Sequence, residues 1–186
     1  DGQFDFVLYH GVSYRVFAHD DAGMLHADFW TQQSQIQFPA GSIMTPFIGS
    51  HDSPRFTTLA TYRGQPGFDK SVPGNQWTNV AGAPPDGEPY ARHGTALSWL
   101  LGLPGAPLLY YGDEYGEWGG SDRGNRAMWR GDGTLSAEEQ ALLALSKKLG
   151  TARKDLIALR RGSYRSLHAT ETFLAHRNLL FTVAYE

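Results

Sequence analysis

The stretch that decides the fold runs from residue 42 to residue 56 and reads Ser42-Ile-Met-Thr-Pro-Phe-Ile-Gly-Ser-His-Asp-Ser-Pro-Arg-Phe56. Its first half is an apolar run with the length of a buried strand, interrupted only by Pro46. The run continues without a spacer into His51 and Asp52. Parallel α/β folds place their chemistry at the downstream ends of buried strands. The stretch therefore predicts a parallel sheet with a functional site at the end of this strand.

The same residues also have a purely structural interpretation. Asp and Ser are good helix N-caps, and Pro favours the first helical position. Asp52 or Ser53 would then cap a short helix that begins at Pro54. Taken alone, the stretch supports both interpretations about equally, so other parts of the chain have to separate them.

A second region favours the functional interpretation. Residues 105 to 116 read Gly-Ala-Pro-Leu-Leu-Tyr-Tyr-Gly-Asp-Glu-Tyr-Gly, and residues 125 to 129 read Asn-Arg-Ala-Met-Trp. With the first stretch, they resemble the last two barrel strands of the α-amylase family of glycoside hydrolases. That family closes its barrel with a strand ending in His-Asp, then one ending in Gly-Asp-Glu, then a loop with an Asn-Arg-x-x-x-Trp-like segment. Ser50 stands where the family usually has Asn, a change expected to loosen a local hydrogen bond without removing the chemistry.

Composition excludes several classes of protein and site. The 186 residues are enough for one domain, or one domain and the start of another. A formal net charge of −3 gives no basic surface for nucleic acid, and the absence of cysteine excludes disulfides and thiolate sites. No apolar run is long enough to span a membrane. Because the chain opens with Asp1 and has no leader sequence, we expect it to be cut from a longer protein, and its compartment stays open.

Strands and helices are expected to alternate along the first part of the chain. Residues 4 to 9 are typical of a strand, and residues 22 to 38 of a helix with Leu25, Phe29 and Ile36 on its buried face. The strand before the His-Asp pair follows. After a loop rich in Gly and Pro over residues 63 to 89, a helix is predicted over residues 90 to 103. Its expected buried residues are Ala96, Leu97, Leu100 and Leu101.

The pattern continues with a strand over residues 106 to 111 that should be covered on both faces. A capping box at Ser136 and Glu139 then opens the strongest helical pattern in the chain, which is expected to reach Leu159 with a break near Gly150. Three further segments have strand-like composition, at residues 163 to 167, 172 to 176 and 180 to 185.

This order predicts an α/β fold. Three strands cannot close an eight-stranded barrel. The resemblance implies that residues 1–161 are the C-terminal portion of a (β/α)8 TIM barrel, about strands six to eight with their helices. It implies that residues 162–186 begin an antiparallel β domain. The unpaired sheet edges should make the chain either a marginal monomer or one that associates, with the missing N-terminal half of the barrel or with itself.

The resemblance also assigns roles to site residues. Retaining glycosidases use two carboxylates about 5 Å apart, a nucleophile and an acid/base. In the family these two follow the fourth and fifth strands, so they would lie upstream of Asp1. The chain would keep the third carboxylate, Asp52, which binds hydroxyls of the sugar being cleaved and stabilises the oxocarbenium-like transition state. His51 would donate to the same sugar.

Other polar residues have weaker assignments. Asp122 and Arg126, with Trp118 of the same loop, are candidates for binding neighbouring sugars, although a loop-bracing ion pair is an equal alternative for the two charged residues. The adjacent pair Asp113-Glu114 is assigned to structure, because neighbouring side chains on an extended chain point to opposite faces. Arg55 likewise reads first as a brace. No histidine spacing predicts a metal ligand set, and neither a metal nor another cofactor is expected.

The predicted function is therefore part of an α-amylase-family glycosidase or transglycosidase that acts on α-glucosidic bonds by a retaining mechanism. The segment itself supplies the stabilising Asp but neither the nucleophile nor the acid/base, so it should be inactive alone. The expected partner is an α-glucan or α-glucoside substrate, with no nucleic acid and no membrane. The alternative is a non-catalytic amylase-like module for carbohydrate binding or scaffolding.

Overall fold

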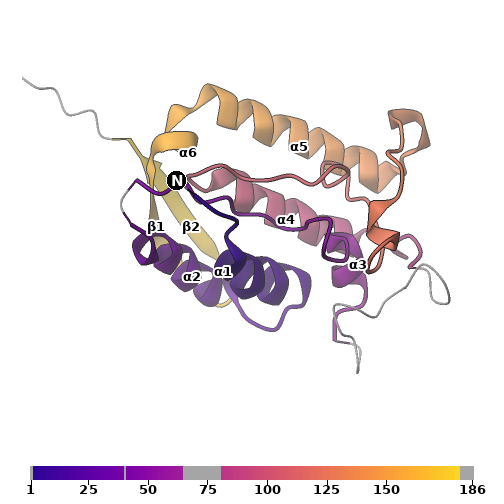
Figure 1. Ribbon diagram of the computed structural model, residues 1–186, viewed down its shortest axis with the longest axis horizontal. Coiled ribbons are helices and arrows are strands. Elements are labelled where there is room, and N and C mark those ends of the chain that lie inside the picture. The colour runs from indigo at the N-terminus through magenta and orange to yellow at the C-terminus, as the bar shows by residue number, and fades with distance from the viewer. Residues whose placement is uncertain (1, 40, 65–80, 181–186) are drawn as a thin grey trace, which may run out of the picture.

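The computed structural model of the protein describes residues 2–39, 41–64 and 81–180. Helices gather around a few extended segments, with α5 along one edge, α4 at the centre and α2 on the other side (Figure 1). The elements in chain order are α1 (Phe6–Leu8), η1 (Tyr9–Ala18), α2 (Met24–Gln37), α3 (Phe56–Thr61), α4 (Glu88–Gly102), η2 (Gly124–Arg126), η3 (Asp132–Thr134), α5 (Ala137–Asp155), α6 (Ile157–Arg161), β1 (Ser163–Ala169) and β2 (Leu174–Leu179).

Three extended segments lie side by side and run parallel to one another. Isolated parallel bridges join Phe4 to Thr45 and Phe47 to Leu108. The Leu108 amide donates to the carbonyl of Pro46 at 2.9 Å, so the interrupting proline accepts within the layer although it cannot donate. The middle segment is the one that leads into the His-Asp pair. The segments therefore run in the predicted parallel direction, but within the described residues they pair only through these isolated bridges and form no regular strand.

The coverage of these segments differs from the prediction. Leu109 and Tyr111 are each 37% exposed, whereas the strand over residues 106 to 111 was expected to be covered on both faces. Ile43, at the start of the middle segment, is 59% exposed. A layer of three short segments has few neighbours, and the described residues cover only part of its surface.

The strand predicted over residues 4 to 9 is wrong beyond its second residue, Asp5. The chain is extended at Phe4, but Asp5 is the N-cap of α1, and its carboxylate accepts a hydrogen bond from the Leu8 amide at 2.9 Å. The chain then passes directly into η1, a π-helical segment. An Asp side chain that accepts a hydrogen bond from the amide three residues ahead begins a helix. This local bond outweighs the strand preference of the alternating apolar residues.

Helix α2 forms as predicted, but its predicted buried face is wrong. Leu25, Phe29 and Ile36 are 45%, 52% and 74% exposed. The buried side of the helix carries small and polar residues instead, and it packs against η1 and β1. These buried residues are Ala27, Asp28, Thr31 and Ser34. Two of them are satisfied by long-range hydrogen bonds, from the Trp99 indole to Thr31 and from the Tyr164 hydroxyl to Asp28.

Helix α4 is the centre of the hydrophobic core. It contacts α3, α5 and η1, and the four residues of its predicted buried stripe are all buried. Apolar side chains from α1, η1, α3 and α5 pack around it. The core residues with the least exposure are Val12, Ala18, Ala27, Ile48, Ala60, Ala96, Leu97 and Leu100.

Helix α5 begins at the predicted capping box. The Ser136 side chain accepts from the Glu139 amide, and the Glu139 side chain accepts from the Ser136 amide. The predicted break near Gly150 is wrong, because the helix runs on to Asp155 and breaks only at Leu156 before α6. A Cβ at Gly150 would meet no other described part of the chain within 4 Å outside its own helix, so tertiary packing gives no reason for a break there.

A β-hairpin follows α6. Strands β1 and β2 are antiparallel, with Ser163 opposite Leu179 and a bulge between Ser166 and His168. The first two strand-like segments of the sequence are therefore confirmed, while the third, at residues 180 to 185, lies outside the described residues apart from its first. Among the described helices, none has both the length and the apolarity needed to cross a bilayer.

Candidate functional site

The turn after the middle parallel segment is held by its own polar groups. The Ser50 hydroxyl accepts from the Asp52 amide at 3.2 Å, and the Ser53 hydroxyl accepts from the Ser50 amide at 3.0 Å. Helix α3 begins only at Phe56, and its N-cap, Arg55, makes no side-chain cap hydrogen bond. The interpretation of Asp52 or Ser53 as a helix cap is therefore wrong. Ser50, which departs from the family pattern, still anchors the backbone of the pair.

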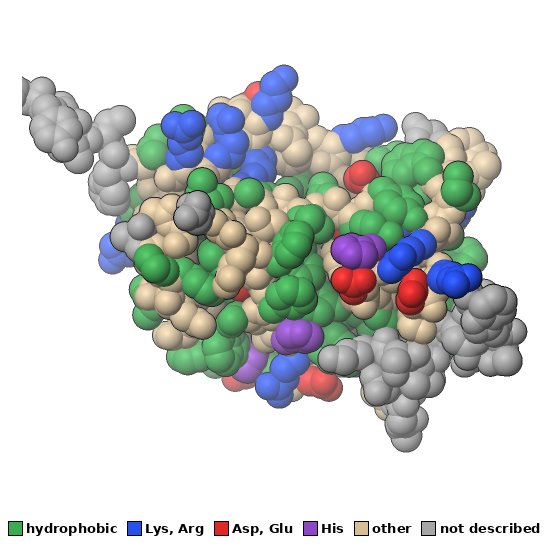
Figure 2. Space-filling view, in the orientation of Figure 1, with side chains coloured by type: hydrophobic (Ala, Val, Ile, Leu, Met, Phe, Trp, Pro, Cys, Tyr) green, Lys and Arg blue, Asp and Glu red, His purple; other side chains and the backbone are tan. Residues whose placement is uncertain are grey.

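Four of the five candidate site residues come together at this turn. The His51 Nε2 atom lies 3.2 Å from the Asp52 carboxylate, and Arg126 Nη2 lies 3.7 Å from the same carboxylate. Arg126 Nε is also 3.2 Å from the carboxylate of Asp122. A histidine, acidic side chains and basic side chains lie together on the face of the molecule drawn in Figure 2.

These polar groups are open to solvent. The side chains of His51 and Asp52 are 61% and 75% exposed, and that of Arg126 is 44% exposed. Exposed ion pairs contribute little to stability, typically about 0–1 kcal/mol. The cluster therefore has little structural value, while its acceptor oxygens and donor nitrogens are free to meet the hydroxyl groups of a ligand.

An aromatic hollow adjoins the pair. A cavity of about 120 Å³ is lined by residues from all three parallel segments, and His51 and Asp52 form one of its walls. The imidazole ring is 6.4 Å from the ring of Tyr110, centroid to centroid. The other lining residues are Phe4, Phe6, Phe47, Ser50, Leu108 and Leu109. A polar pair beside apolar rings matches the chemistry of a sugar, which has hydroxyl edges and apolar C–H faces.

Asn125 clamps the backbone of the pair from beneath. It is fully buried, and its Nδ2 atom donates to the carbonyls of His51 and Ser53, both at 2.8 Å. Arg55 holds the clamp in turn, because its Nε atom donates to the Asn125 carbonyl at 2.8 Å. The sequence interpretation of Arg55 as a brace agrees with this contact.

A buried charge pair lies under the site. The guanidinium of Arg55 is 3.5 Å from the carboxylate of Asp113, and both side chains are 1% exposed. The guanidinium also stacks on the ring of Tyr110, with its carbon 4.2 Å from the ring centroid. Burial raises the pKa of Asp113 to about 7, although Arg55 acts in the opposite direction. The pair ties the His-Asp turn to the end of the third parallel segment.

Asp113 and Glu114 both serve their own turn. Asp113 Oδ2 accepts from the Tyr110 amide at 3.0 Å, and Glu114 Oε2 accepts from the Gly112 amide at 2.7 Å. The two residues lie in a tight turn and not on an extended strand, so the geometric reason given for separating them does not apply. Their structural assignment agrees with these contacts all the same.

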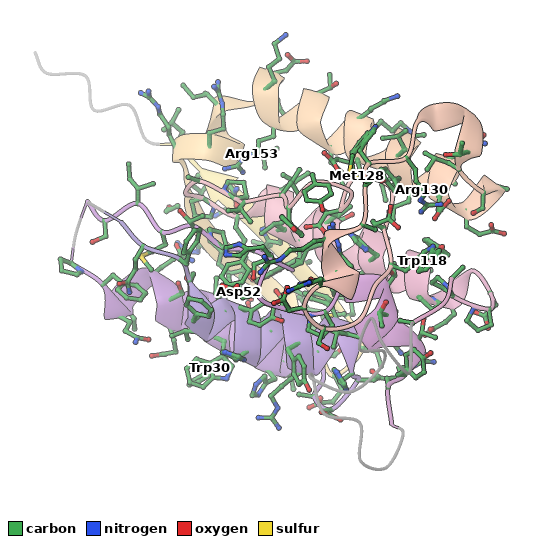
Figure 3. All side chains as sticks on the ribbon, turned by 45° about the vertical axis from the view of Figure 1, so that its right-hand side comes forward. Trp30, Asp52, Trp118, Met128, Arg130 and Arg153 are labelled. Atoms are coloured by element: carbon green, nitrogen blue, oxygen red, sulfur yellow. The ribbon has the colours of Figure 1, made fainter. Side chains whose placement is uncertain are left out.

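Trp118 lies in a different part of the molecule from the other candidates. It lines a cavity of about 370 Å³ with Tyr90, Arg130 and Glu138, and this cavity contains neither His51 nor Asp52. The Arg130 guanidinium carbon lies 5.7 Å from the Trp118 ring centroid. Asp52 and Trp118 are drawn well apart in Figure 3, with Trp118 on the side of Arg130.

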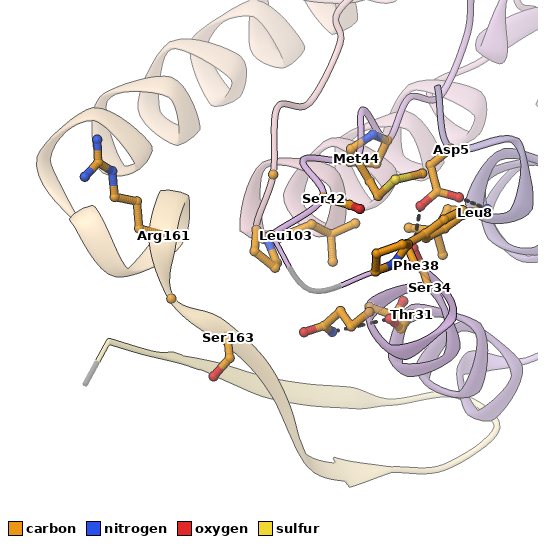
Figure 4. A pocket seen from close by; sticks show the side chains of 17 residues that line it. Asp5, Leu8, Thr31, Ser34, Phe38, Ser42, Met44, Leu103, Arg161 and Ser163 are labelled. Atoms are coloured by element: carbon orange, nitrogen blue, oxygen red, sulfur yellow. Dashed lines mark hydrogen bonds between the residues drawn. The ribbon is translucent and has the colours of Figure 1, made fainter. Parts of the chain in front are cut away.

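A larger hollow lies at the opposite end of the parallel segments. Its volume is about 390 Å³, and Figure 4 shows it between the end of α2, the segments near Met44 and Leu103, and the start of β1. Its buried carboxylate, Asp5, already accepts hydrogen bonds from Leu8 and Ser34. Sites in parallel α/β folds lie at the downstream strand ends, so the smaller hollow beside His51 is the better candidate.

Sequence reasoning missed two participants. Asn125 belonged to the quoted motif but received no role, and Tyr110 was read only as part of a strand. A buried amide that clamps two carbonyls has no local sequence signal, because its partners lie more than 70 positions away. Within the described ranges, no group of three or more His, Asp or Glu side chains is arranged to hold a metal ion.

Comparison with known proteins gives consistent matches. No protein-family model matches the chain. An amylopullulanase from Thermoanaerobacter thermohydrosulfuricus is 30% identical over 122 residues, which make up 66% of this chain and 7% of that protein. An α-amylase from Geobacillus thermoleovorans, solved in complex with acarbose, matches with a TM-score of 0.73 and 25% identity, over 97% of this chain and 34% of that one.

A further solved structure, of AmyP in complex with maltose, shares the fold. It matches with a TM-score of 0.78 and 22% identity, over 97% of this chain and 37% of its own. The chain thus spans about a third of the length of these solved structures and a much smaller share of the amylopullulanase. The solved structures that it resembles also include an Anoxybacillus α-amylase and a cyclomaltodextrinase. The resemblance of this chain to the α-amylase family of glycoside hydrolases is therefore confirmed over nearly all of its length.

Proposed function

We propose that this chain forms the C-terminal part of the catalytic barrel of an α-amylase-family glycosidase or transglycosidase. Residues 1–161 would supply about strands six to eight with their helices, and residues 162–186 the start of an antiparallel β domain. The three parallel segments and the hairpin that follows α6 support this assignment. The substrate class is an α-glucan or α-glucoside, as in the relatives solved with maltose and acarbose.

One observation carries the proposal. His51 and Asp52 project from the downstream end of a parallel segment into solvent beside an aromatic hollow, and a guanidinium lies next to the carboxylate. The exposed carboxylate accepts hydrogen bonds from sugar hydroxyls, and the imidazole donates to the same ring. Contacts of this kind strengthen as positive charge develops on the ring, which lowers the barrier to cleavage.

Asp52 is assigned the role of stabiliser, while the nucleophile and the acid/base of a retaining reaction lie in another part of the barrel. The nearest candidates for such a pair within this chain, Asp113 and Glu114, are engaged by amides of their own turn. Arg126 and Asp122 would bind a neighbouring sugar at the rim. Trp118 would contact a more distant sugar, because it lines a separate cavity.

The remainder of the barrel is the expected partner of this chain. The edge segment at Phe4 is open, and Phe4 and Phe6 are 52% and 55% exposed there. In the absence of the other barrel strands, a second copy of the chain would meet the same surface.

The test is an activity assay on starch, maltooligosaccharides and chromogenic α-glucosides. The full natural chain that contains these residues should hydrolyse or transfer an α-glucoside with retention of anomeric configuration. The configuration of the first products is measured by NMR. Residues 1–186 alone should not turn over. Robust activity of residues 1–186 would contradict the assigned roles, and sugar binding without turnover by the full chain would favour the non-catalytic alternative.

A further inference from the structure

We propose that Asn125 is a positioning residue for Asp52, which it aims by clamping the backbone on both sides of it. This inference rests on the proposed function, because it gives Asn125 its effect on the reaction only through the Asp52 carboxylate. The inference does not require Asn125 to contact the sugar, because its side chain is 0% exposed.

The clamp spans two residues, Asp52 and Ser53. One amide hydrogen of Asn125 goes to the carbonyl of His51 and the other to the carbonyl of Ser53, each at 2.8 Å, so the peptide unit directly before Asp52 and the one that follows Ser53 are both held. Arg126 adds a donor to the His51 carbonyl at 3.3 Å. The primary amide of Asn supplies both donors from one nitrogen, whereas a carboxylate in the same place would turn an oxygen toward each carbonyl.

The clamp is itself anchored to rigid structure. The backbone carbonyl of Asn125 accepts a hydrogen bond from Arg55 Nε. The Arg55 guanidinium also donates to the Tyr111 carbonyl at 2.6 Å and stacks on Tyr110. The clamp therefore relates the His-Asp turn to the end of the neighbouring parallel segment. A displacement of Asn125 would move Asp52 relative to the other residues that line the cavity.

Asp52 depends on this backbone control because little else holds its side chain. The side chain is 75% exposed, and it contacts the His51 ring at 3.2 Å and Arg126 at 3.7 Å. Packing does not fix a carboxylate that is this open, so the backbone sets its direction. Misplacement of a catalytic contact by about 1 Å can cost on the order of 10²-fold in rate.

A double-mutant cycle in the full natural chain tests the inference. The variants are Asn125→Ala, Asp52→Asn and the two combined, assayed on maltooligosaccharide well below the melting temperature of each. We expect Asn125→Ala to lower kcat by about 10- to 100-fold with a smaller change in KM. In the Asp52→Asn background it should change kcat by less than about twofold, because the group it positions has lost its function.

Asn178 provides a matched control. Its Nδ2 atom also donates to a backbone carbonyl, that of Gly102 at 2.6 Å, but it lies on the hairpin away from the site. Asn178→Ala should lower the melting temperature and leave kcat unchanged. If Asn125→Ala does not fold, Asn125→Ser retains one donor and enters the same cycle.

The outcomes are separable. An equal loss of kcat from the Asn125 substitution in both backgrounds would show a merely structural role and overturn the inference, with the proposed function intact. The same holds if Asn125→Ala keeps wild-type kcat while Asp52→Asn loses it. If Asp52→Asn keeps full activity, the proposed role of Asp52 fails, and the inference fails with it.

Discussion

Arg55 and Asp113 place two charges in the interior, directly beneath the candidate site. Each group has partners: the guanidinium donates to the carbonyls of Asn125 and Tyr111 and stacks on Tyr110, while the carboxyl group accepts from a backbone amide. Arg55 Nη2 and Asp113 Oδ1 have no hydrogen-bond partner among the described residues. Such a pair is costly to break, because removing one partner leaves the other buried and uncompensated. Arg55 and Asp113 are buried and charged, as many catalytic groups are, but here they hold the turn that carries Asp52.

Arg55→Met should strongly destabilise the protein, by about 3–5 kcal/mol in the free energy of unfolding. Arg126→Met is the matched control, since its side chain is 44% exposed and its ion pairs are solvated. The control should change the free energy of unfolding by at most about 1 kcal/mol. Urea unfolding followed by circular dichroism measures both. Similar losses from the two variants would contradict the assignment of Arg55 as the buried brace.

The pKa of Asp113 predicts a pH dependence of stability. Burial raises this pKa to about 7 in the folded chain, against about 3.9 in an unfolded one. Between these values the folded state holds a proton that the unfolded state has released. The contribution of Asp113 is therefore fully present below about pH 4 and is lost as the pH rises through about 7.

Asp113→Asn removes this titration while keeping the shape of the side chain. The difference in free energy of unfolding between wild type and variant should fall steadily from pH 4 to pH 7, roughly the interval between the two pKa values. Denaturant titrations at several pH values measure it. A difference that is constant or rises over this range would show that the carboxyl is ionised throughout.

At the scale of elements, the start of α5 rests on a capping box that the sequence shows directly. Ser136→Ala removes the acceptor for the Glu139 amide and should lower the free energy of unfolding by about 1 kcal/mol. Thr151→Ala, in the same helix, removes only an exposed hydroxyl bonded to the Lys147 carbonyl and should have almost no effect. The melting temperatures of the two variants and of the wild type, measured by thermal unfolding, test this expectation. Equal stability of Ser136→Ala and wild type would rule out a contribution from the cap.

The elements also show where sequence patterns succeed and fail. The apolar stripe of α4 and the capping box of α5 were predictable, because periodicity and capping are local properties. The buried face of α2 was not, because Asp28 and Thr31 are buried by bonds to Tyr164 and Trp99, which are far away in the sequence. Periodicity assumes that the apolar side is the buried one, and these long-range partners reverse it.

The candidate site was predictable only in part for a similar reason. His51 and Asp52 were found because they follow an apolar strand, and Arg126 because it belongs to a recognisable motif. The separation of Trp118 from them, and the clamp by Asn125, depend on how the loop over residues 112 to 134 folds. Loop conformation is set by contacts such as that of Arg55 with the Asn125 carbonyl, which no local pattern records.

At the scale of the whole molecule, an apolar surface remains open. Phe29 and Ile36 on α2, with Phe4 and Phe6 at the edge of the parallel layer, are all more than half exposed. Residues 1–186 alone should therefore associate in a concentration-dependent way, as measured by sedimentation velocity. Ile36→Lys should reduce the association without lowering the melting temperature, because the side chain is 74% exposed. A monodisperse monomer that unfolds cooperatively at every concentration would contradict this expectation.

The central claim is that the carboxylate of Asp52 stabilises the transition state of α-glucoside cleavage. The most direct measurement is kcat on a maltooligosaccharide for the full natural chain and for its Asp52→Asn variant. Asn keeps the shape of the side chain but lacks its charge, so kcat should fall by about 10²-fold or more while circular dichroism and melting temperature stay unchanged. A folded Asp52→Asn variant with wild-type kcat would contradict the account.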